Sequence, residues 1–277
     1  IFGLAAIVAL ASCNKGINPE KNSVQGENLV TYSFGAQIAT KTVLDVDGET
    51  PKFVDGDELK ICYITNTETK DAVGTVKGTI KGDVITFDAP AGIQGFYAIY
   101  PYSETYYAKY DNDAKLFGVK LNQGKANGSF ADANGMVAYS TVNDAFFAFK
   151  NLTAIIKFKA PSFADQVLGV RFRGVEASTN IDGSAAKFNG IVPIVTDGTA
   201  VTDFGNVTAE GTANMQTSSS VQPDTDGYYY IPVNPVILTG LGIWFQTETE
   251  RPGTVNDKVY AFERGHIYTI NNIESKL

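Results

Sequence analysis

The sequence has few residues of the kinds that usually carry catalysis or bind metal ions. Among its 277 residues there are one histidine, His266, and two cysteines, Cys13 and Cys62. A single histidine excludes most zinc sites and catalytic triads, and neither cysteine stands in a metal-ligand spacing. The nucleophile motif Gly-x-Ser-x-Gly is also missing. We therefore expect no enzyme activity, no metal ion and no cofactor.

Positive charge is scarce as well. The 22 lysines and arginines are outnumbered by 30 aspartates and glutamates, which gives a formal net charge of -8. Phosphate binding depends on clustered basic side chains. The one dense basic pair, Arg171 and Arg173, has a spacing that is typical of the solvent face of a strand. The composition therefore argues against nucleic acid as a partner.

Long hydrophobic runs are absent except at the beginning of the chain. Residues 1–12 are apolar, too few to span a bilayer, and typical of the hydrophobic region of a secretory signal. They run into Leu10-Ala11-Ser12-Cys13, which resembles the lipobox of bacterial lipoproteins. The lipobox implies cleavage before Cys13 and acylation of its sulfur. An ordinary signal peptide with a chance cysteine, or a disulfide from Cys13 to Cys62, are the alternatives.

A polar segment at residues 13–28 follows this signal. It is rich in Asn, Lys, Glu, Gly and Ser, and it cannot bury enough apolar surface to fold alone. We predict that it is a lipidated tether. Because Asn14 rather than an aspartate follows Cys13, the segment is compatible with sorting to the outer membrane. The expected location is thus the cell surface, with the protein anchored in the outer membrane through its lipid.

Alternating apolar and polar residues dominate the rest of the chain. This period of two, with Gly, Asn and Asp between the runs, is typical of short strands joined by tight turns. No window shows a sustained helical period, so we predict an all-β fold. The predicted strands cover residues 29–38, 59–64, 74–80, 84–87, 96–100, 137–139, 146–149, 152–158, 167–172, 186–188, 191–195, 228–233, 241–246, 258–262 and 266–273.

The length of the chain is compatible with one large or two small domains, at roughly 150 residues per domain. A break near Lys150 and Asn151 divides the chain into halves of similar size. Many short strands of this kind favour β-sandwiches or barrels. We therefore predict one β domain at residues 29–150 and a second at residues 151–277.

Six motifs follow one another from residue 39 to the end of the chain. They are Ala39-Thr40-Lys41-Thr42, Phe53-Val54-Asp55-Gly56-Asp57-Glu58-Leu59-Lys60-Ile61, Tyr97-Ala98-Ile99-Tyr100-Pro101-Tyr102-Ser103, Asn151-Leu152-Thr153-Ala154-Ile155-Ile156-Lys157-Phe158, Tyr230-Ile231-Pro232-Val233 and Gly265-His266-Ile267-Tyr268-Thr269-Ile270. Their order, behind a lipobox, resembles the fimbrillin family, the lipoprotein subunits of the type V pili of Bacteroidota. The resemblance implies two tandem transthyretin-like β-sandwich domains. It also implies a structural or adhesive subunit of a fimbria.

Assembly by donor-strand exchange is a further implication of the resemblance. A protease removes the first strand, and a strand of another pilus subunit fills the groove through main-chain hydrogen bonds. In this sequence the removable strand is residues 29–38, and the cleavage position maps to Lys41, for which a solvated loop lysine is the alternative. Because Leu277 comes directly after the last predicted strand, with no further strand to donate, we expect a tip or accessory subunit.

Tyrosines are frequent between residues 97 and 110. Tyr102, Tyr106 and Tyr107 are candidate contacts for a glycan or another adhesion ligand on a host or bacterial surface. The alternative is that the tyrosines of this region pack into the core and its rim. A lipid-anchored glycan-binding protein of the cell surface is accordingly the second functional hypothesis.

Acidic residues gather just before the second predicted strand. Asp55-Gly56-Asp57 is a turn signal, because glycine tolerates a positive φ and aspartate side chains bond nearby backbone N–H groups. A weak calcium site that also uses Asp45, Asp47 and Glu49 is the alternative, although the spacing is not that of an EF-hand.

Overall fold

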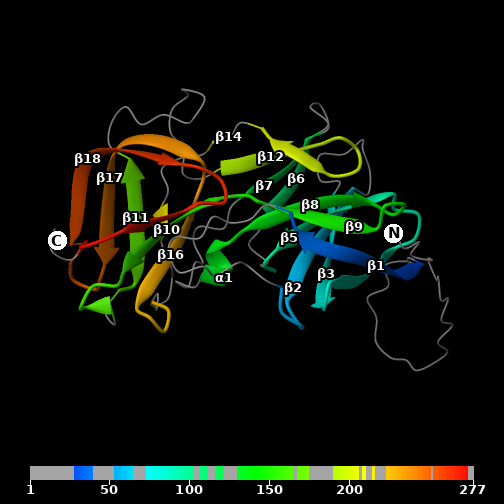
Figure 1. The fold of residues 1–277 in the computed structure, drawn as a ribbon, viewed down its shortest axis with the longest axis horizontal. Helices are drawn as coiled ribbons and strands as arrows, with labels where there is room; N and C mark the ends of the chain where they lie inside the picture. The colour runs from blue at the N-terminus through cyan, green and yellow to red at the C-terminus, as the bar shows by residue number, and fades with distance from the viewer. Residues whose placement is uncertain are drawn as a thin grey trace.

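The computed structural model describes residues 28–39, 53–64, 73–102, 107–111, 116–120, 130–164, 167–174, 190–205, 208–209, 214–215, 223–250 and 252–273. Nearly all of their regular structure is strand, which confirms the all-β prediction. The exception is a single turn of helix, α1 (Phe130–Ala133). In these ranges no helix is long and apolar enough to cross a membrane. Figure 1 shows the strands gathered in two groups, β1 to β9 on the right and the last strands on the left.

Seven strands of the N-terminal half close into a barrel, in the order β1-β4-β3-β2-β5-β8-β9. Neighbouring strands run antiparallel, except that β9 and β1 run parallel where the barrel closes. β3 and β4 form a hairpin, and Gly82 in its turn has a φ of 61°, which suits glycine. The seven strands are β1 (Leu29–Ile38), β2 (Glu58–Ile64), β3 (Val73–Lys81), β4 (Val84–Pro90), β5 (Gly95–Tyr100), β8 (Met136–Thr141) and β9 (Phe146–Asn151).

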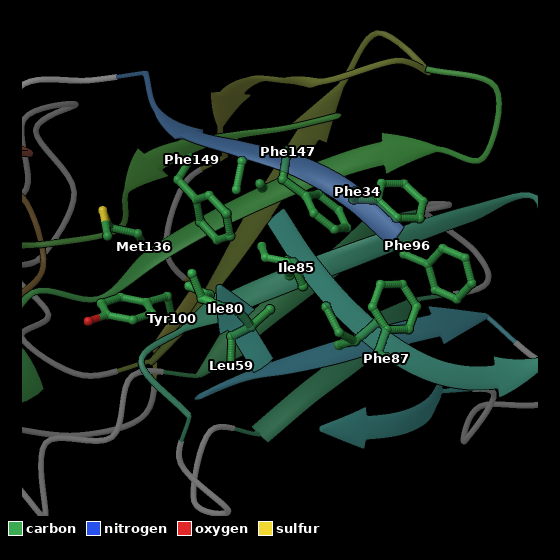
Figure 2. Close-up of a cluster of buried hydrophobic side chains, with 14 of the residues drawn as sticks. Phe34, Leu59, Ile80, Ile85, Phe87, Phe96, Tyr100, Met136, Phe147 and Phe149 are labelled. Carbon is green, nitrogen blue, oxygen red and sulfur yellow. The ribbon is translucent and has the colours of Figure 1, made fainter. Parts of the chain in front are cut away.

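Aromatic side chains fill much of the barrel interior. Figure 2 shows Phe34, Phe87, Phe96, Phe147 and Phe149 converging there from the four strands β1, β4, β5 and β9. Successive side chains of a strand point to opposite faces, so the period-two pattern of the sequence places one residue in two inside. The barrel is thus a packed core and has its own hydrophobic cluster.

A second sheet covers one side of this barrel. Its order is β13-β12-β7-β6, and its strands are β6 (Tyr107–Asp111), β7 (Leu116–Lys120), β12 (Gly190–Thr196) and β13 (Val201–Phe204), with β14 (Thr208–Ala209) beside β12. Cys62, Tyr97 and Ile99 of the barrel pack in one cluster with Phe117 and Val192 of this sheet. As a result β2 and β5 are buried on both faces, which alternation alone did not predict.

The C-terminal strands form two facing sheets around a third cluster. One sheet has the order β16-β10-β19, with β10 (Ala154–Lys159), β16 (Tyr228–Val233) and β19 (Ile267–Ile270). The other has the order β15-β11-β17-β18, with β11 (Gly169–Gly174), β15 (Asn214–Met215), β17 (Val236–Gln246) and β18 (Gly253–Phe262). Phe158 and Tyr229 of the first sheet are buried against Phe245 of the second, so this half is a sandwich.

One ladder crosses the division that was predicted near residue 150. In β12, Val192 pairs with Val119 of β7, and Ile194 pairs with Phe117. Residues 190–204 therefore leave the C-terminal half of the sequence and complete the sheet that covers the barrel. Nothing in the composition near these residues indicated such a return.

Most predicted strands are present with bounds within a few residues of those expected, and residues 29–38 match β1 at both ends. The predicted strand at residues 186–188 lies outside the described residues. The two-residue strands β14 and β15 were not predicted, and neither were β6, β7 and β13. The last three strands have four or five residues each, and Gly118 interrupts the apolar pattern of β7, so their periodic signal was short.

Candidate functional site

The first strand, β1, lies in the barrel between two neighbours of opposite direction. Its first seven residues, Leu29–Gly35, pair antiparallel with β4. Its last four, Gly35–Ile38, pair parallel with β9. The ladder extends beyond the strand at both ends, because the N–H of Ala91 donates to the carbonyl of Asn28 at 3.0 Å and that of Ala39 donates to the carbonyl of Phe149 at 2.8 Å. β1 is therefore the piece that joins β4 to β9 and closes the barrel.

The inward face of β1 carries Tyr32, Phe34, Ala36 and Ile38. Phe34 is 2% exposed, and its ring stacks on Phe147 with centroids 4.7 Å apart. It also meets the rings of Phe87 and Phe96, with centroid distances of 5.6 Å and 5.8 Å. Figure 2 shows the three rings beside one another. Aromatic pairs of this kind contribute roughly 0.5–1.5 kcal/mol each beyond the area they bury. The side chains of β1 thus pack among the aromatic rings of β4, β5 and β9.

Tyr32 lies above Phe34 in the groove formed by these rings. Its ring meets Phe96 at 4.8 Å and Phe87 at 5.6 Å, while its hydroxyl donates to the carbonyl of Pro90 at 3.0 Å. Burial raises the pKa of this phenol, because the charged form loses its hydration. At this position the groove therefore combines apolar aromatic walls with one backbone carbonyl that accepts a hydrogen bond.

The outward face of β1 has no such cover. Leu29 is 58% exposed on this face, and Thr31, Ser33 and Gln37 are also exposed. The Thr31 hydroxyl on this face donates to the Asp88 carboxylate at 2.6 Å. β1 is therefore held by its two ladders and its inward side chains, with little packing from outside the barrel.

Gly35 stands where β1 changes from one neighbour to the other. Its N–H donates to the carbonyl of Ala145 at 2.9 Å, and a Cβ added there would lie 2.7 Å from the Phe146 ring. A side chain at this position would displace that ring, so the crossing needs glycine. Gly35 lies inside a strand pattern in the sequence. A glycine in the interior of a strand often marks a place where another part of the chain approaches the backbone closely.

The predicted lipidation and processing sites have no described structure. Cys13, the expected lipidation site, and Lys41, the expected processing site, lie outside the described residues. Ala39, the last described residue before the gap, stands two positions from Lys41. Both assignments remain predictions from the sequence.

The predicted tyrosine contacts fall into three situations. Tyr102 is half-buried, and the Lys77 ammonium lies 4.4 Å from the centroid of its ring while it also pairs with Glu58 at 3.0 Å. One face of the Tyr102 ring is thereby occupied. Tyr106 lies outside the described residues, and Tyr107 is placed only by its backbone, as the first residue of β6.

Three other tyrosines of the same region belong to the core. Tyr97, Tyr100 and Tyr110 are buried, and the ring of Tyr97 stacks on Phe117 with centroids 3.9 Å apart. Burial also raises the pKa of the Tyr97 phenol. For these three residues the alternative of core packing is confirmed.

The acidic turn before β2 is a structural element. The Asp55 carboxylate accepts the N–H of Gly82 at 2.6 Å. One oxygen of Asp57 accepts the N–H of Val54 at 2.8 Å and the hydroxyl of Tyr100 at 2.9 Å. Asp45, Asp47 and Glu49, the other residues of the calcium alternative, lie outside the described part of the chain. Within that part, no three potential ligands gather in a way that could hold a metal ion.

Cys62 is a buried thiol without a reactive setting. It lies between the barrel and the covering sheet, and burial raises its pKa to about 12. A thiolate is the nucleophilic form of cysteine, so this residue is inert at neutral pH. The proposed pairing with Cys13 involves a residue outside the described ranges.

Comparisons with known proteins gave matches only among solved structures. No family model matches the chain, and no curated protein sequence matches it. A candidate cell adhesion protein from Bacteroides uniformis aligns with a TM-score of 0.41 and 18% identity, over 89% of this chain and 94% of its own. A fimbrial protein from Bacteroides ovatus aligns at 0.35 and 12%, over 90% and 50%.

A third structure is the tip fimbrial protein Mfa3 from Porphyromonas gingivalis with a C-terminal truncation. It aligns with a TM-score of 0.34 and 9% identity, over 88% of this chain and 95% of its own. These are fimbrial and adhesion proteins, as the motif resemblance predicted. Similarity at such TM-scores and identities transfers neither an activity nor a mechanism.

Proposed function

We propose that this protein is a lipid-anchored subunit or adhesin of a bacterial fimbria, exposed on the outer membrane through the lipid on Cys13. In this proposal a protease cuts at Lys41, β1 leaves, and a strand of another subunit takes its place. The protein acts by assembly and adhesion, not by catalysis. The observation that carries the proposal is the position of β1, which closes the barrel with aromatic side chains inside and an open outer face.

The chemistry of the vacated position suits strand addition. Departure of β1 would leave the backbone edge of β4 opposite Leu29–Gly35 and that of β9 opposite Gly35–Ile38 without partners. Unpaired edges of this kind bind extended peptides through main-chain hydrogen bonds, while alternate side chains enter pockets. The rings of Phe87, Phe96 and Phe147 would form those pockets. The open groove therefore favours another strand as its occupant.

The tandem arrangement of two transthyretin-like sandwich domains, divided near residue 150, is part of the same proposal. In its support, the barrel and the C-terminal sandwich have separate hydrophobic clusters. In each half the first strand lies between an antiparallel neighbour and a parallel last strand. The N-terminal half differs from a sandwich of two separate sheets, because its seven strands close into a barrel. Residues 190–204, from the C-terminal half of the sequence, cover this barrel.

Limited trypsin digestion of the purified full chain tests the proposal. We expect one early cut after Lys41, release of the segment that contains β1, and oligomers that appear only after the cut. Lys41→Gln should abolish both the cut and the oligomers. Lys81→Gln, which makes the same change at an exposed turn, should leave both intact. Oligomers that form equally well from uncut protein would contradict the proposal.

A further inference from the structure

A cavity of about 450 Å³ lies where three distant segments meet. Lys150 and Asn151 come from the end of β9, Thr202, Asp203 and Phe204 from β13, and Arg264 from the turn between β18 and β19. The volume is within the range of roughly 300–1,000 Å³ that is usual for small-molecule sites. Because its walls belong to both halves of the chain, the cavity exists only in the folded arrangement.

Two cations face this cavity, and both are held in place by uncharged groups. The Lys150 ammonium donates to the carbonyl of Thr202 at 2.8 Å. The Arg264 guanidinium donates to the carbonyl of Leu152 and lies 4.2 Å from the centroid of the Phe204 ring. Among the described residues, no carboxylate is within ion-pair distance of either cation. The cations are therefore positioned but not neutralised.

The setting of Arg264 makes that imbalance costly. Burial lowers the pKa of its guanidinium to about 10, and the charge of Asp203 only partly opposes this effect. A buried cation without a close counter-ion is destabilising, and a planar guanidinium is well suited to hold a carboxylate with two hydrogen bonds. An anion in the cavity would supply the missing partner.

The remaining wall restricts which anion would fit. One carboxylate oxygen of Asp203 accepts the N–H of Phe204 at 2.8 Å, and the carboxylate would also accept a hydrogen bond from a ligand hydroxyl. Its negative charge leaves the cavity with one net positive charge, which suits a single carboxylate better than a doubly charged phosphate. Asn151 and Thr202 add polar groups that pair with hydroxyls, and Phe204 adds an apolar wall.

We propose that this cavity binds a sugar unit that bears a carboxylate, such as a uronic acid. Lys150 and Arg264 hold the carboxylate, and Asp203 with the polar wall holds the ring hydroxyls. The site is distant in sequence from the tyrosines considered above and does not depend on strand exchange. A fimbrial subunit would function as an assembly element without it, so the two proposals fail independently.

Calorimetric titration of the full chain with glucuronate, glucose, acetate and inorganic phosphate tests the site. We expect saturable binding of glucuronate, with each other probe weaker by about tenfold or more, because each loses a charged or hydroxyl contact. Glucose that binds as tightly as glucuronate would overturn the role of the cations. Equal binding of acetate or phosphate would overturn the sugar specificity, and no binding of glucuronate would overturn the site itself.

Variants assign the contacts. Lys150→Gln is expected to weaken glucuronate binding by about tenfold, whereas Lys81→Gln, far from the cavity, leaves it unchanged. Asp203→Asn removes a negative charge from the cavity, so it should lower the ratio of the glucuronate affinity to the phosphate affinity. Since Arg264→Gln could unfold the junction, Arg264→Lys, which keeps the charge, is measured beside it with circular dichroism as the check of folding. Unchanged affinity in a folded Lys150→Gln protein overturns the proposal.

Discussion

The first strands of the two halves occupy the same topological place but are held in very different ways. β1 lies between β4, antiparallel over seven residue pairs, and β9, parallel over four. β10 lies between β16, antiparallel over six pairs, and β19, parallel over four. In each half the first strand thus lies between an antiparallel strand and the last strand of that half. Backbone pairing alone does not distinguish a removable strand from a permanent one.

Packing and chain continuity make the distinction. β10 follows β9 through Leu152 and Thr153, which are both buried, so no exposed peptide precedes it. On its outward side Ile155 is 1% exposed, whereas the outward side chains of β1 are open to solvent. When a strand that is buried on one face leaves the sheet, it loses side-chain packing on that face only. This difference agrees with the proposal that β1, and not β10, is the exchangeable strand.

Deletion of residues 28–39 should produce the largest difference between the halves. We expect amides of Val84–Pro90 and Phe146–Asn151 to lose protection from hydrogen exchange, because their partner is gone. Protection in Ala154–Lys159 and Tyr228–Val233 should persist, because the sandwich keeps its own core. Mass spectrometry of exchange measures both sets in one sample. Loss of protection in β10 as well would show that the halves fold as one unit.

The matched truncations Phe34→Ala in β1 and Phe158→Ala in β10 compare the contribution of one buried ring in each of the two first strands. Both side chains are buried, so each change should lower the free energy of unfolding by about 3–5 kcal/mol in the intact chain. After trypsin has released the first strand, Phe34→Ala should have no further effect, while Phe158→Ala keeps its full effect. Denaturant melts before and after cleavage measure this. An unchanged cost of Phe34→Ala after cleavage would mean that β1 stays bound.

The crossing point of β1 predicts a smaller effect. Gly35→Ala places a methyl group against the Phe146 ring, which is 42% exposed and can partly move away. The expected cost is about 1 kcal/mol, at the lower end for overpacking. Phe146→Ala in the same chain should recover most of that cost, as a double-mutant cycle would show. Independent, additive effects of the two changes would remove the steric explanation.

The outer face of β1 should give the smallest effect. Thr31→Val removes the bond to Asp88 at constant shape, with an expected cost of about 0.5–1 kcal/mol. Ser33→Ala, on the same exposed face, serves as the control and should change the free energy of unfolding by less than about 0.5 kcal/mol. Thermal melts resolve the two. A cost above that of Gly35→Ala would mean that the outer face is packed in solution.

Local pattern predicted the strands whose signal was long and regular. The bounds of β1, the hairpin at Gly82 and the inward set of β10 follow from alternation and turn residues, which act within a few positions of the chain. The short strands β6, β7 and β13 were missed. Their residues gain their stability from the barrel face that they cover, and that face is distant in sequence.

The candidate site divides in the same way. The sequence named β1 as the strand to be exchanged, through a resemblance and through its alternating residues. It could not show that Phe147 of β9 and Phe96 of β5 complete the groove, because alternation says which face a residue occupies and nothing about which strand lies beside it. The cavity at Lys150, Phe204 and Arg264 was missed for the same reason, since no local pattern relates residues so far apart.

The sequence by itself determined that the chain is all-β and where most of its strands begin and end. These properties come from short-range sterics and from the period of the pleat, which every strand carries in its own residues. Only the tertiary structure decided that β1 closes a barrel between β4 and β9, and that β12 returns to cover it. Those choices depend on the packing of complementary faces from distant segments, so they are properties of the whole fold.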